Sequence, residues 1–270
     1  MSEPPVVTFL SDYGTDTEFV GVCHGVIRGI CPGVPIVDIT HGIPKYDARQ
    51  GALVLRNTIP YMPVGVHLGI VDPQVGTERR ALALRCEDGR ILVGPDNGLL
   101  SLAWERCGGV TEAVDVTRSQ HRLEPVSATF HGRDLFAPVT AHLAAGAELL
   151  DAGEGLDVGE LAVVELARPR VEDGALVARV LSVDRFGNAA LNASHEDLAG
   201  TGLTLGAGVE IEVADERFNA TFAHTFADVK PGEMIVYEDA YRALAIAINR
   251  GDAAFVLHLS PDDEVLLRPR

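Results

Sequence analysis

Two short polar segments carry the residues best suited to chemistry. The segment 71–80 reads VDPQVGTERR and places Asp72 and Arg79 in one turn, while the segment 129–138 reads TFHGRDLFAP and places His131 in another. A carboxylate, a guanidinium and an imidazole held together can bind and orient a water molecule or hydroxide and adjust the charge around it. We therefore take these three as candidate catalytic residues, and none of them needs a metal for this task.

The same residues also have a plain structural interpretation. An Asp–Arg pair in a loop is often only an ion pair that joins two turns. His131 is harder to explain in this way, because it lies between Phe130 and Gly132 in a stretch without helical periodicity, where a satisfied core histidine is unusual. Both interpretations stay open at this point.

Length and charge limit the class of protein. The chain has 270 residues, of which 47% are hydrophobic and 6% aromatic, and this composition favours an α/β protein with a sheet core. Its net charge of −17 is dispersed, so we expect no nucleic-acid partner, because phosphate binding needs concentrated Lys and Arg. The N-terminal segment lacks the pattern of a signal peptide, and apolar runs fall short of the roughly 20 residues that cross a bilayer. We expect a cytoplasmic protein without a membrane partner.

Cysteines and histidines do not predict a metal site. The four cysteines show neither CxxC pairs nor zinc spacing with the nine histidines, which indicates reduced core thiols. A metal cluster can be imagined from His24 and His41 together with Asp12 and Asp47. No spacing puts two of these on one helix face, so we expect no metal. The phosphate-loop, GxGxxG and GxSxG templates do not match either.

Apolar runs predict alternating strands and helices in the N-terminal part. We expect strands at 5–11, 34–39, 65–71, 81–86, 90–94 and 112–116, and helices at 17–31, 47–59, 98–107 and 134–146. This alternation predicts a mainly parallel sheet covered by helices on both faces, with ligands at the carboxyl ends of the strands. Asp12 and Asp72 each follow a predicted strand, so both should reach the same sheet edge, which the His131 turn could also reach.

The pattern changes after about residue 160. Short β-rich segments at 175–183, 203–213, 218–226 and 233–237 are separated by Gly, Asp and Asn turns. We therefore predict an α/β catalytic domain over 1–164, a linker over 165–174 and a smaller, mostly antiparallel β-rich domain over 175–270.

Five ordered motifs resemble those of the S-adenosyl-L-methionine hydroxide adenosyltransferases, relatives of the fluorinase and chlorinase. They are SDYGTD at 11–16, VDPQVGTERR at 71–80, PDNGLL at 95–100, TFHGRDLFAP at 129–138 and VDRFGNAALN at 183–192. Together they span nearly the whole chain, which makes the set far more specific than any single motif. The resemblance implies a large α/β domain, a small β-rich domain and a homotrimer with active sites between one subunit's large domain and its neighbour's small one.

The resemblance also implies a reaction. Water or hydroxide attacks the ribose C5′ carbon of S-adenosyl-L-methionine and gives adenosine and methionine, with no metal or added cofactor. The family's catalytic trio falls on Asp72, Arg79 and His131. Because the sulfonium already makes methionine a good leaving group, the difficulty lies in the nucleophile, since bulk water has a pKa near ~15.7. Which of the three residues, if any, is the base stays open.

Six further residues are implied to bind this substrate. Asp12 would bind the ribose hydroxyls, Tyr46 and Phe130 would wall the sugar, Asp184 would receive the methionine ammonium group, Asn188 would bind the adenine edge or ribose, and Phe226 would stack on adenine. Plainer alternatives exist: Asp12 can be a loop cap, Asn188 part of a Gly-Asn turn and Phe226 a core residue.

Two other functions stay open. A halogenase would make a 5′-halo-5′-deoxyadenosine, but the halide enzymes carry a tyrosine where Asp72 stands, and a carboxylate beside the nucleophile would repel halide. The fluorinase has a serine at the Gly132 position, but the chlorinase has glycine there too, so Gly132 argues only against fluoride. A non-catalytic sensor would bind adenosine or S-adenosyl-L-methionine without turnover. Ala240 and Tyr241 replace the fluorinase's Ser-Arg pair at the methionine end, so the carboxylate contact is unassigned.

Overall fold

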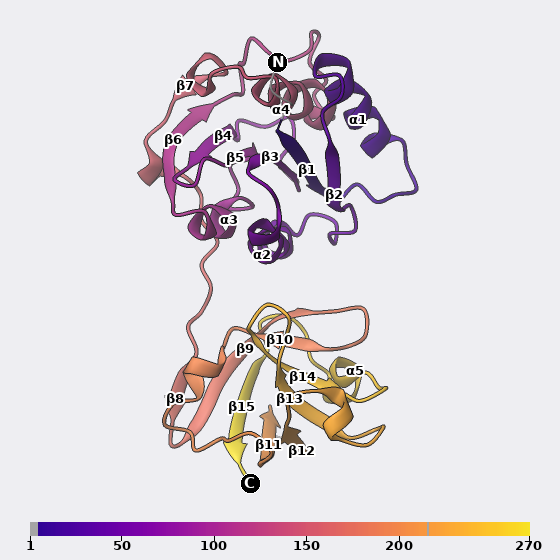
Figure 1. Cartoon of the computed structure of the whole chain (residues 1–270), viewed down its shortest axis with the longest axis vertical. Helices are drawn as coiled ribbons and strands as arrows, with labels where there is room; N and C mark the ends of the chain where they lie inside the picture. Colours follow the sequence, from indigo (N-terminus) through magenta and orange to yellow (C-terminus); the bar gives the residue numbers. More distant parts are fainter. Residues whose placement is uncertain (1–4, 215) are drawn as a thin grey trace. The chain divides into compact units, whose positions relative to one another are not determined.

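Strands and helices alternate along the first part of the chain, as the apolar pattern predicts. The computed structural model describes residues 5–214 and 216–270, and the chain divides into two units between Val164 and Glu165 (Figure 1). In the described part of the first unit, one sheet has the strand order β2-β1-β3-β5-β4-β6-β7. Its strands are β1 Val6–Ser11, β2 Ile36–Thr40, β3 Gly65–Ile70, β4 Ala81–Cys86, β5 Ile91–Pro95, β6 Val110–Asp115 and β7 Glu154–Gly155.

Strand directions confirm the predicted α/β class. The pairs β1–β2, β1–β3 and β3–β5 are parallel, while β4 is antiparallel to both β5 and β6, and β7 is antiparallel to β6. Consequently β1, β2, β3, β5 and β6 all run in one direction. Their carboxyl ends meet at one edge, where ligands of such sheets bind.

Helices cover both faces of this sheet. They are α1 Phe19–Ile30, α2 Ala48–Thr58, α3 Ser101–Arg106 and α4 Ala137–Ala144. Helices α1 and α4 pack together on one face, and α2 and α3 on the other (Figure 1). Because side chains alternate along a strand, Phe9 of β1 joins the core beneath α1 and α4, whereas Leu10 joins the core beneath α2 and α3.

The helix expected over 134–146 begins earlier and in a different form. Residues Gly132–Phe136 form a π-helical turn that leads directly into α4. Such turns often occur at functional sites, because they displace side chains from α-helical spacing. Here the turn follows His131 directly. Short 3₁₀ turns occupy Ile59–Tyr61, Leu149–Asp151, Val158–Glu160, His195–Leu198 and Phe226–Asp228.

The second unit is a β-barrel, which confirms the predicted small, mostly antiparallel domain. Its elements are β8 Arg170–Glu172, β9 Ala175–Val183, β10 Ala189–Leu191, β11 Gly208–Val213, β12 Glu216–Phe222, β13 Met234–Glu238, β14 Leu244–Ile248, α5 Ala253–Leu257 and β15 Glu264–Pro269. Strand order is β10-β14-β13-β12-β11-β15-β9, closed by a β9–β10 pairing, and β8 adds to β9. The β12–β13 pair is parallel and the others are antiparallel.

The segment expected as a linker, 165–174, contains a strand. Strand β8 lies inside that range and forms a hairpin with β9. Asp173 and Gly174 make the turn with φ values of 49° and 75°, and two successive positive φ values suit a two-residue hairpin. The Asp-Gly pair therefore signals a hairpin turn here, where the sequence analysis assigned it to a linker.

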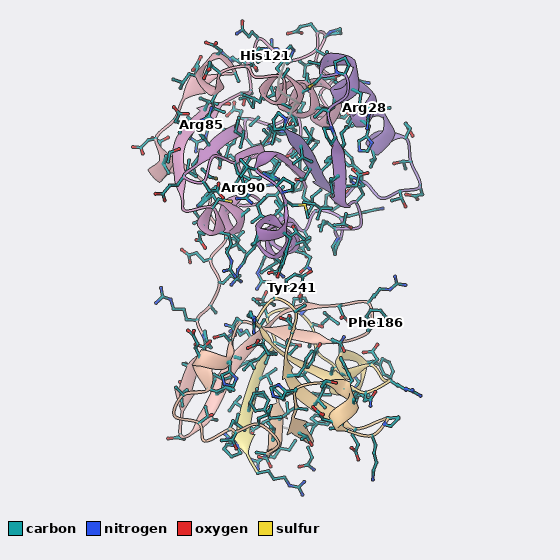
Figure 2. All side chains as sticks on the ribbon, viewed as in Figure 1. Arg28, Arg85, Arg90, His121, Phe186 and Tyr241 are labelled. Atoms are coloured by element: carbon teal, nitrogen blue, oxygen red, sulfur yellow. The ribbon has the colours of Figure 1, made fainter. Side chains whose placement is uncertain are left out.

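Surface side chains of the second unit include two aromatic residues near its loops. Phe186 is 68% exposed and Tyr241 is 44% exposed (Figure 2). In the whole described part of the chain, no helix combines the length and the apolar character that crossing a membrane requires.

Candidate active site

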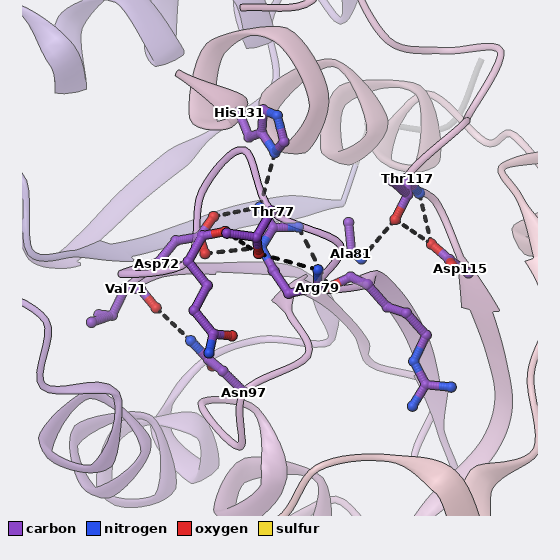
Figure 3. Close-up of polar contacts among 11 residues, drawn as sticks. Val71, Asp72, Thr77, Arg79, Ala81, Asn97, Asp115, Thr117 and His131 are labelled. Atoms are coloured by element: carbon purple, nitrogen blue, oxygen red, sulfur yellow. Dashed lines mark hydrogen bonds and ion pairs between the residues drawn. The ribbon is translucent and has the colours of Figure 1, made fainter. Parts of the chain in front are cut away.

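Asp72, Arg79 and His131 lie together, as their residue types suggested. Arg79 donates from Nε to Asp72 Oδ1 at 2.9 Å and from Nη2 to Asp72 Oδ2, so the two side chains form a bidentate pair (Figure 3). The same Nη2 lies 3.0 Å from Nδ1 of His131. The guanidinium therefore links the carboxylate of one loop to the imidazole of another, 52 residues along the chain from Arg79.

Burial strengthens this pair. The Arg79 and Asp72 side chains are only 4% and 6% exposed. Removing one partner of such a buried pair leaves an uncompensated charge and costs about 3–5 kcal/mol of stability. Both interpretations of the Asp72–Arg79 pair therefore hold. The pair joins two ends of a loop, and it also holds a fixed charge beside His131.

The chain positions Asp72 through its backbone. Asn97, from the motif PDNGLL, donates from Nδ2 to the carbonyl oxygen of Val71 at 2.8 Å (Figure 3) and accepts from the Leu99 amide at 3.2 Å. Gly98 follows with a φ of +88°, which a residue with a side chain rarely adopts. This motif was predicted only as part of the resemblance, with no role for Asn97. Its Asn-Gly pair was the local signal that could have indicated a turn here.

Arg79 is supported from several sides. Its amide donates to Thr77 Oγ1 at 3.3 Å, and its guanidinium carbon lies 5.1 Å from the ring centroid of Phe136, within cation–π range. Just beyond it, the Ala81 amide donates to Thr117 Oγ1 at 3.0 Å and fixes the start of β4 (Figure 3). Sequence reasoning missed Phe136, whose contact with Arg79 spans 57 residues and has no local signal.

Hydrogen-bond chemistry defines the tautomer of His131. A guanidinium can only donate, so His131 Nδ1 accepts from Arg79 and the proton of the neutral ring lies on Nε2. Burial lowers the pKa of His131 below its ordinary value, and the positive charge of Arg79 lowers it further, against opposing effects of Asp72 and Asp134. The ring is therefore neutral near pH 7, and Nε2–H is available as a hydrogen-bond donor.

A cavity of about 630 Å³ lies beside the trio. Asp72 and His131 line it together with two predicted binding residues, Asp12 and Tyr46. Cavities of this size commonly hold small organic ligands. The structure thus brings four of the residues predicted for the large domain to one space.

Asp12 also supports the cavity wall. Its Oδ2 accepts from the Tyr46 amide at 3.0 Å, where Tyr46 has a φ of 69° and a side chain that is 71% exposed. The loop-cap alternative for Asp12 is therefore observed, and it coexists with a position on the cavity. Phe130 packs against Phe19 and Tyr13, with ring centroids 4.8 and 6.0 Å away, and these two rings line the cavity.

Gly132 allows a close contact at the cavity wall. A Cβ atom at this position would lie 2.2 Å from the hydroxyl oxygen of Tyr13. Tyr13 is held by aromatic contacts with Phe9, Phe19 and Phe130, so its ring has little freedom to retreat. Burial raises the pKa of Tyr13 well above its ordinary value, which keeps the phenol neutral. Any side chain at 132 therefore collides with Tyr13.

The second unit contains its own cavity, of about 410 Å³. Asn188 and Phe226 line it together with Phe186. Phe226 is 36% exposed and its ring centroid lies 5.2 Å from that of Tyr237, so it is not a core residue of the barrel. Asn249 donates from Nδ2 to the carbonyl oxygens of Phe226 and Val229, both at 2.9 Å, and fixes this segment.

Asp184 organises the turn that carries two of these residues. Its Oδ1 accepts from the amides of Phe186 and Asn188 at 2.8 and 2.9 Å, and its Oδ2 accepts from Asn188 Nδ2 at 2.8 Å. Asn188 is therefore part of a capped turn, as the plainer alternative held, and also lines the cavity. Binding of a methionine ammonium group by Asp184 stays a prediction.

Comparisons with known proteins cover almost the whole chain. Residues 7–153 match the model of the SAM hydroxide adenosyltransferase N-terminal domain, and residues 178–266 match that of the C-terminal domain. The chain is 44% identical over 265 residues to a protein of Salinispora tropica named (R)-S-adenosyl-L-methionine hydrolase, with 98% of each chain covered. It is 30% identical over 284 residues to a fluorinase of an Actinoplanes species, with 94% of each chain covered. A crystal structure of an uncharacterized conserved protein from Thermotoga maritima gives a TM-score of 0.91 at 35% identity and covers 97% of this chain and 100% of that one.

Proposed function

This chain belongs to the SAM hydroxide adenosyltransferase family, and we propose on that basis that it hydrolyses S-adenosyl-L-methionine to adenosine and L-methionine. The observation that carries the proposal is the contact of Arg79 with both Asp72 and His131 at the edge of a cavity. The relatives named as hydrolases are also more similar to the chain than those named as fluorinases, at up to 44% against 30% identity.

The proposed step is a displacement at C5′. The oxygen of water forms a bond to C5′ while the C5′–S bond breaks, and the bonding electron pair stays on sulfur as the neutral thioether of methionine. One proton is released to solvent, which balances the lost sulfonium charge. Because the leaving group needs no acid, the protein has only to bind and orient the nucleophile.

The trio suits that task. Nε2–H of neutral His131 donates a hydrogen bond to the attacking oxygen and leaves an oxygen lone pair free for C5′. The buried charge of Arg79 stabilises negative charge that builds on this oxygen as its proton departs. Asp72 holds the guanidinium in place, and its carboxylate on the cavity wall disfavours halide as a competing nucleophile.

Substrate recognition is proposed to use both cavities. Asp12, Tyr46 and Phe130 serve the ribose, Asn188 and Phe226 serve adenine, and Asp184 serves the methionine ammonium group. An aromatic face such as that of Phe226 binds a purine by stacking. We propose the (R)-sulfonium epimer as the substrate, because the relatives at 44% identity carry that epimer in their names.

The test is product analysis with purified enzyme. EDTA-treated protein is incubated separately with the two sulfonium epimers, with and without excess chloride, and adenosine, methionine and chlorinated nucleoside are separated by chromatography. We expect equal adenosine and methionine, independent of chloride, from the (R)-epimer, and no product with His131→Ala. His142→Ala is the matched control, because His142 stacks on His121 and does not line the cavity. A chlorinated nucleoside would identify a halogenase, and binding without product a sensor.

We also propose a cytoplasmic homotrimer with active sites at subunit interfaces, as the family resemblance implies. In support, each unit's cavity carries only part of the proposed binding set. Subunit mixing tests this directly. Arg79→Lys and Phe226→Ala chains are co-refolded and assayed at a substrate concentration well below the parent KM, where each alone is weakly active. Sites shared between subunits should regain turnover, because some combine two unaltered halves. Sites within one subunit would regain none.

A further inference from the structure

Three side chains of the kind that bind metals converge outside the catalytic trio. His24 lies on α1, Asp38 in β2 and His41 in the turn that follows β2. His24 Nε2 lies 2.8 Å from Asp38 Oδ1, and His41 Nε2 lies 3.1 Å from the same oxygen. One ligand atom from each of the three residues lies within 4.8 Å of the other two. A helix, a strand and a turn supply them, which is why no sequence spacing indicated the cluster.

The separations suit a small tetrahedral ion. Zinc binds imidazole nitrogen and carboxylate oxygen at about 2.0–2.1 Å, which places two tetrahedral ligand atoms roughly 3.3 Å apart. The observed separations of 2.8 and 3.1 Å need to open by only a few tenths of an ångström. His24 and Asp38 have side chains that are 28% and 41% exposed, so an ion can reach the cluster from solvent.

His41 supplies a second, independent observation. The residue is 6% exposed, and its Nε2 is buried without a hydrogen-bond partner, although Asp38 lies close enough for an ion pair. His41 Nδ1 lies 2.8 Å from Ser11 Oγ, which can accept a hydrogen bond from Nδ1–H. Nε2 is then a buried lone pair 3.1 Å from a carboxylate oxygen with no hydrogen bond between them, and a cation that binds both atoms satisfies them. A metal-binding histidine typically has this kind of partner on its other nitrogen.

We propose that His24, Asp38 and His41 form a binding site for a divalent transition-metal ion of the Zn²⁺ or Co²⁺ type. Two imidazoles favour these ions over Mg²⁺ and Ca²⁺, which prefer oxygen ligands. The ion joins α1, β2 and the turn that leads to Tyr46, and His41 also lines the large cavity. It stabilises that cavity wall and takes no part in the proposed hydrolysis. The proposal rests on the geometry of the first unit and stands whether or not the hydrolysis proposal holds.

Metal titration of the full chain tests the site. EDTA-treated protein, freed of chelator, is titrated calorimetrically with ZnCl₂, and Co²⁺ absorption reports coordination geometry. We expect one ion per chain, a tetrahedral Co²⁺ spectrum and a rise in Tm of roughly 5 °C with metal in large excess over Kd. His24→Gln and Asp38→Asn should each weaken binding at least tenfold, because each removes one ligand.

Two controls keep the result decisive. His142→Ala should bind as the parent does, because it removes a histidine of the same unit outside the cluster. The Tm of each variant without metal shows whether that variant is folded. His24→Gln changes the more exposed of the two histidines. Absence of saturable binding, unchanged affinity in both cluster variants, or loss of binding in His142→Ala would each overturn the proposal.

Discussion

The two cavities are built in opposite ways. The cavity of the first unit owes its chemistry to charged groups, Asp72 and Arg79, whose side chains are 6% and 4% exposed. The cavity of the second unit displays aromatic side chains, with Phe186 68% and Phe226 36% exposed. In the first, a buried ion pair also binds the distant His131, whereas in the second, hydrogen bonds from the side chains of Asp184 and Asn249 fix the backbone.

The difference follows from what each cavity is proposed to do. A fixed charge acts strongly on a nucleophile only where water is excluded, so Arg79 must be buried, and burial in turn demands the partner Asp72. A flat ring instead needs an open face to stack on, so Phe226 must stay partly exposed. We therefore expect substitutions in the first cavity to lower kcat and substitutions in the second to raise KM.

Arg79→Lys should give the largest effect. Lysine keeps the positive charge, but its single nitrogen lacks the planar fork by which Arg79 contacts both Asp72 oxygens and His131, so kcat should fall about a thousandfold. Arg80→Lys is the matched control, because Arg80 pairs with Asp96 and Glu160 and lies outside the cavity lining. Steady-state kinetics of both variants check this. Parent-like kcat in Arg79→Lys would mean that charge alone suffices and that the bidentate geometry is irrelevant.

Gly132→Ala should lower kcat about a hundredfold, because its Cβ collides with the Tyr13 hydroxyl and displaces the adjoining His131. Adding Tyr13→Phe removes the hydroxyl oxygen that lies 2.2 Å from the new atom and should restore part of the activity. Gly25→Ala on α1 is the control, because open space surrounds its Cβ position. No recovery in the double variant would show that the collision is not the cause.

Phe226→Ala should raise KM about tenfold and leave kcat within twofold, because base stacking contributes about 1–3 kcal/mol and acts on binding. Phe255→Ala serves as the control, since Phe255 is 75% exposed but does not line the cavity. Initial rates over a wide substrate range separate the two constants. A large fall in kcat with unchanged KM would contradict the expectation that substitutions in the second cavity act on KM and those in the first on kcat.

The pH dependence should be the smallest effect. The pKa of His131 is lowered, so the neutral ring that donates from Nε2 persists below the ordinary histidine pKa near 6.5. We expect the acid limb of the kcat profile to lie below pH 6.5. The kcat profile on parent enzyme checks this. An acid limb at or above pH 6.5 would contradict the inferred environment of His131.

Much of the first unit could be predicted because its signals are local. Apolar runs gave the strands, and the rule for parallel sheets placed Asp12 and Asp72 at one edge. Asp72 and Arg79 are seven residues apart in one loop, so their pairing was also a local inference. The hairpin of β8 and β9 was missed because an Asp-Gly pair such as Asp173-Gly174 occurs in linkers as well as in tight turns.

Contacts between distant segments were beyond sequence reasoning. Nothing near Asn97 in the chain shows that its amide binds the Val71 carbonyl, and nothing near Gly132 shows that Tyr13 lies against it. The imagined metal cluster failed for the same reason: Asp47 caps α2 through the Gln50 amide, and it is Asp38 that meets the two histidines. These placements depend on how elements pack.

The spacing of the trio along the chain has a consequence for folding. Asp72 and Arg79 close a loop of seven residues, whereas Arg79 and His131 close one of 52. The longer closure costs about 2 kcal/mol more in chain entropy, so the ion pair can form within an early local turn while the imidazole arrives only with long-range packing. Turnover by refolding protein should therefore appear last, after secondary structure, and report completion of the native topology.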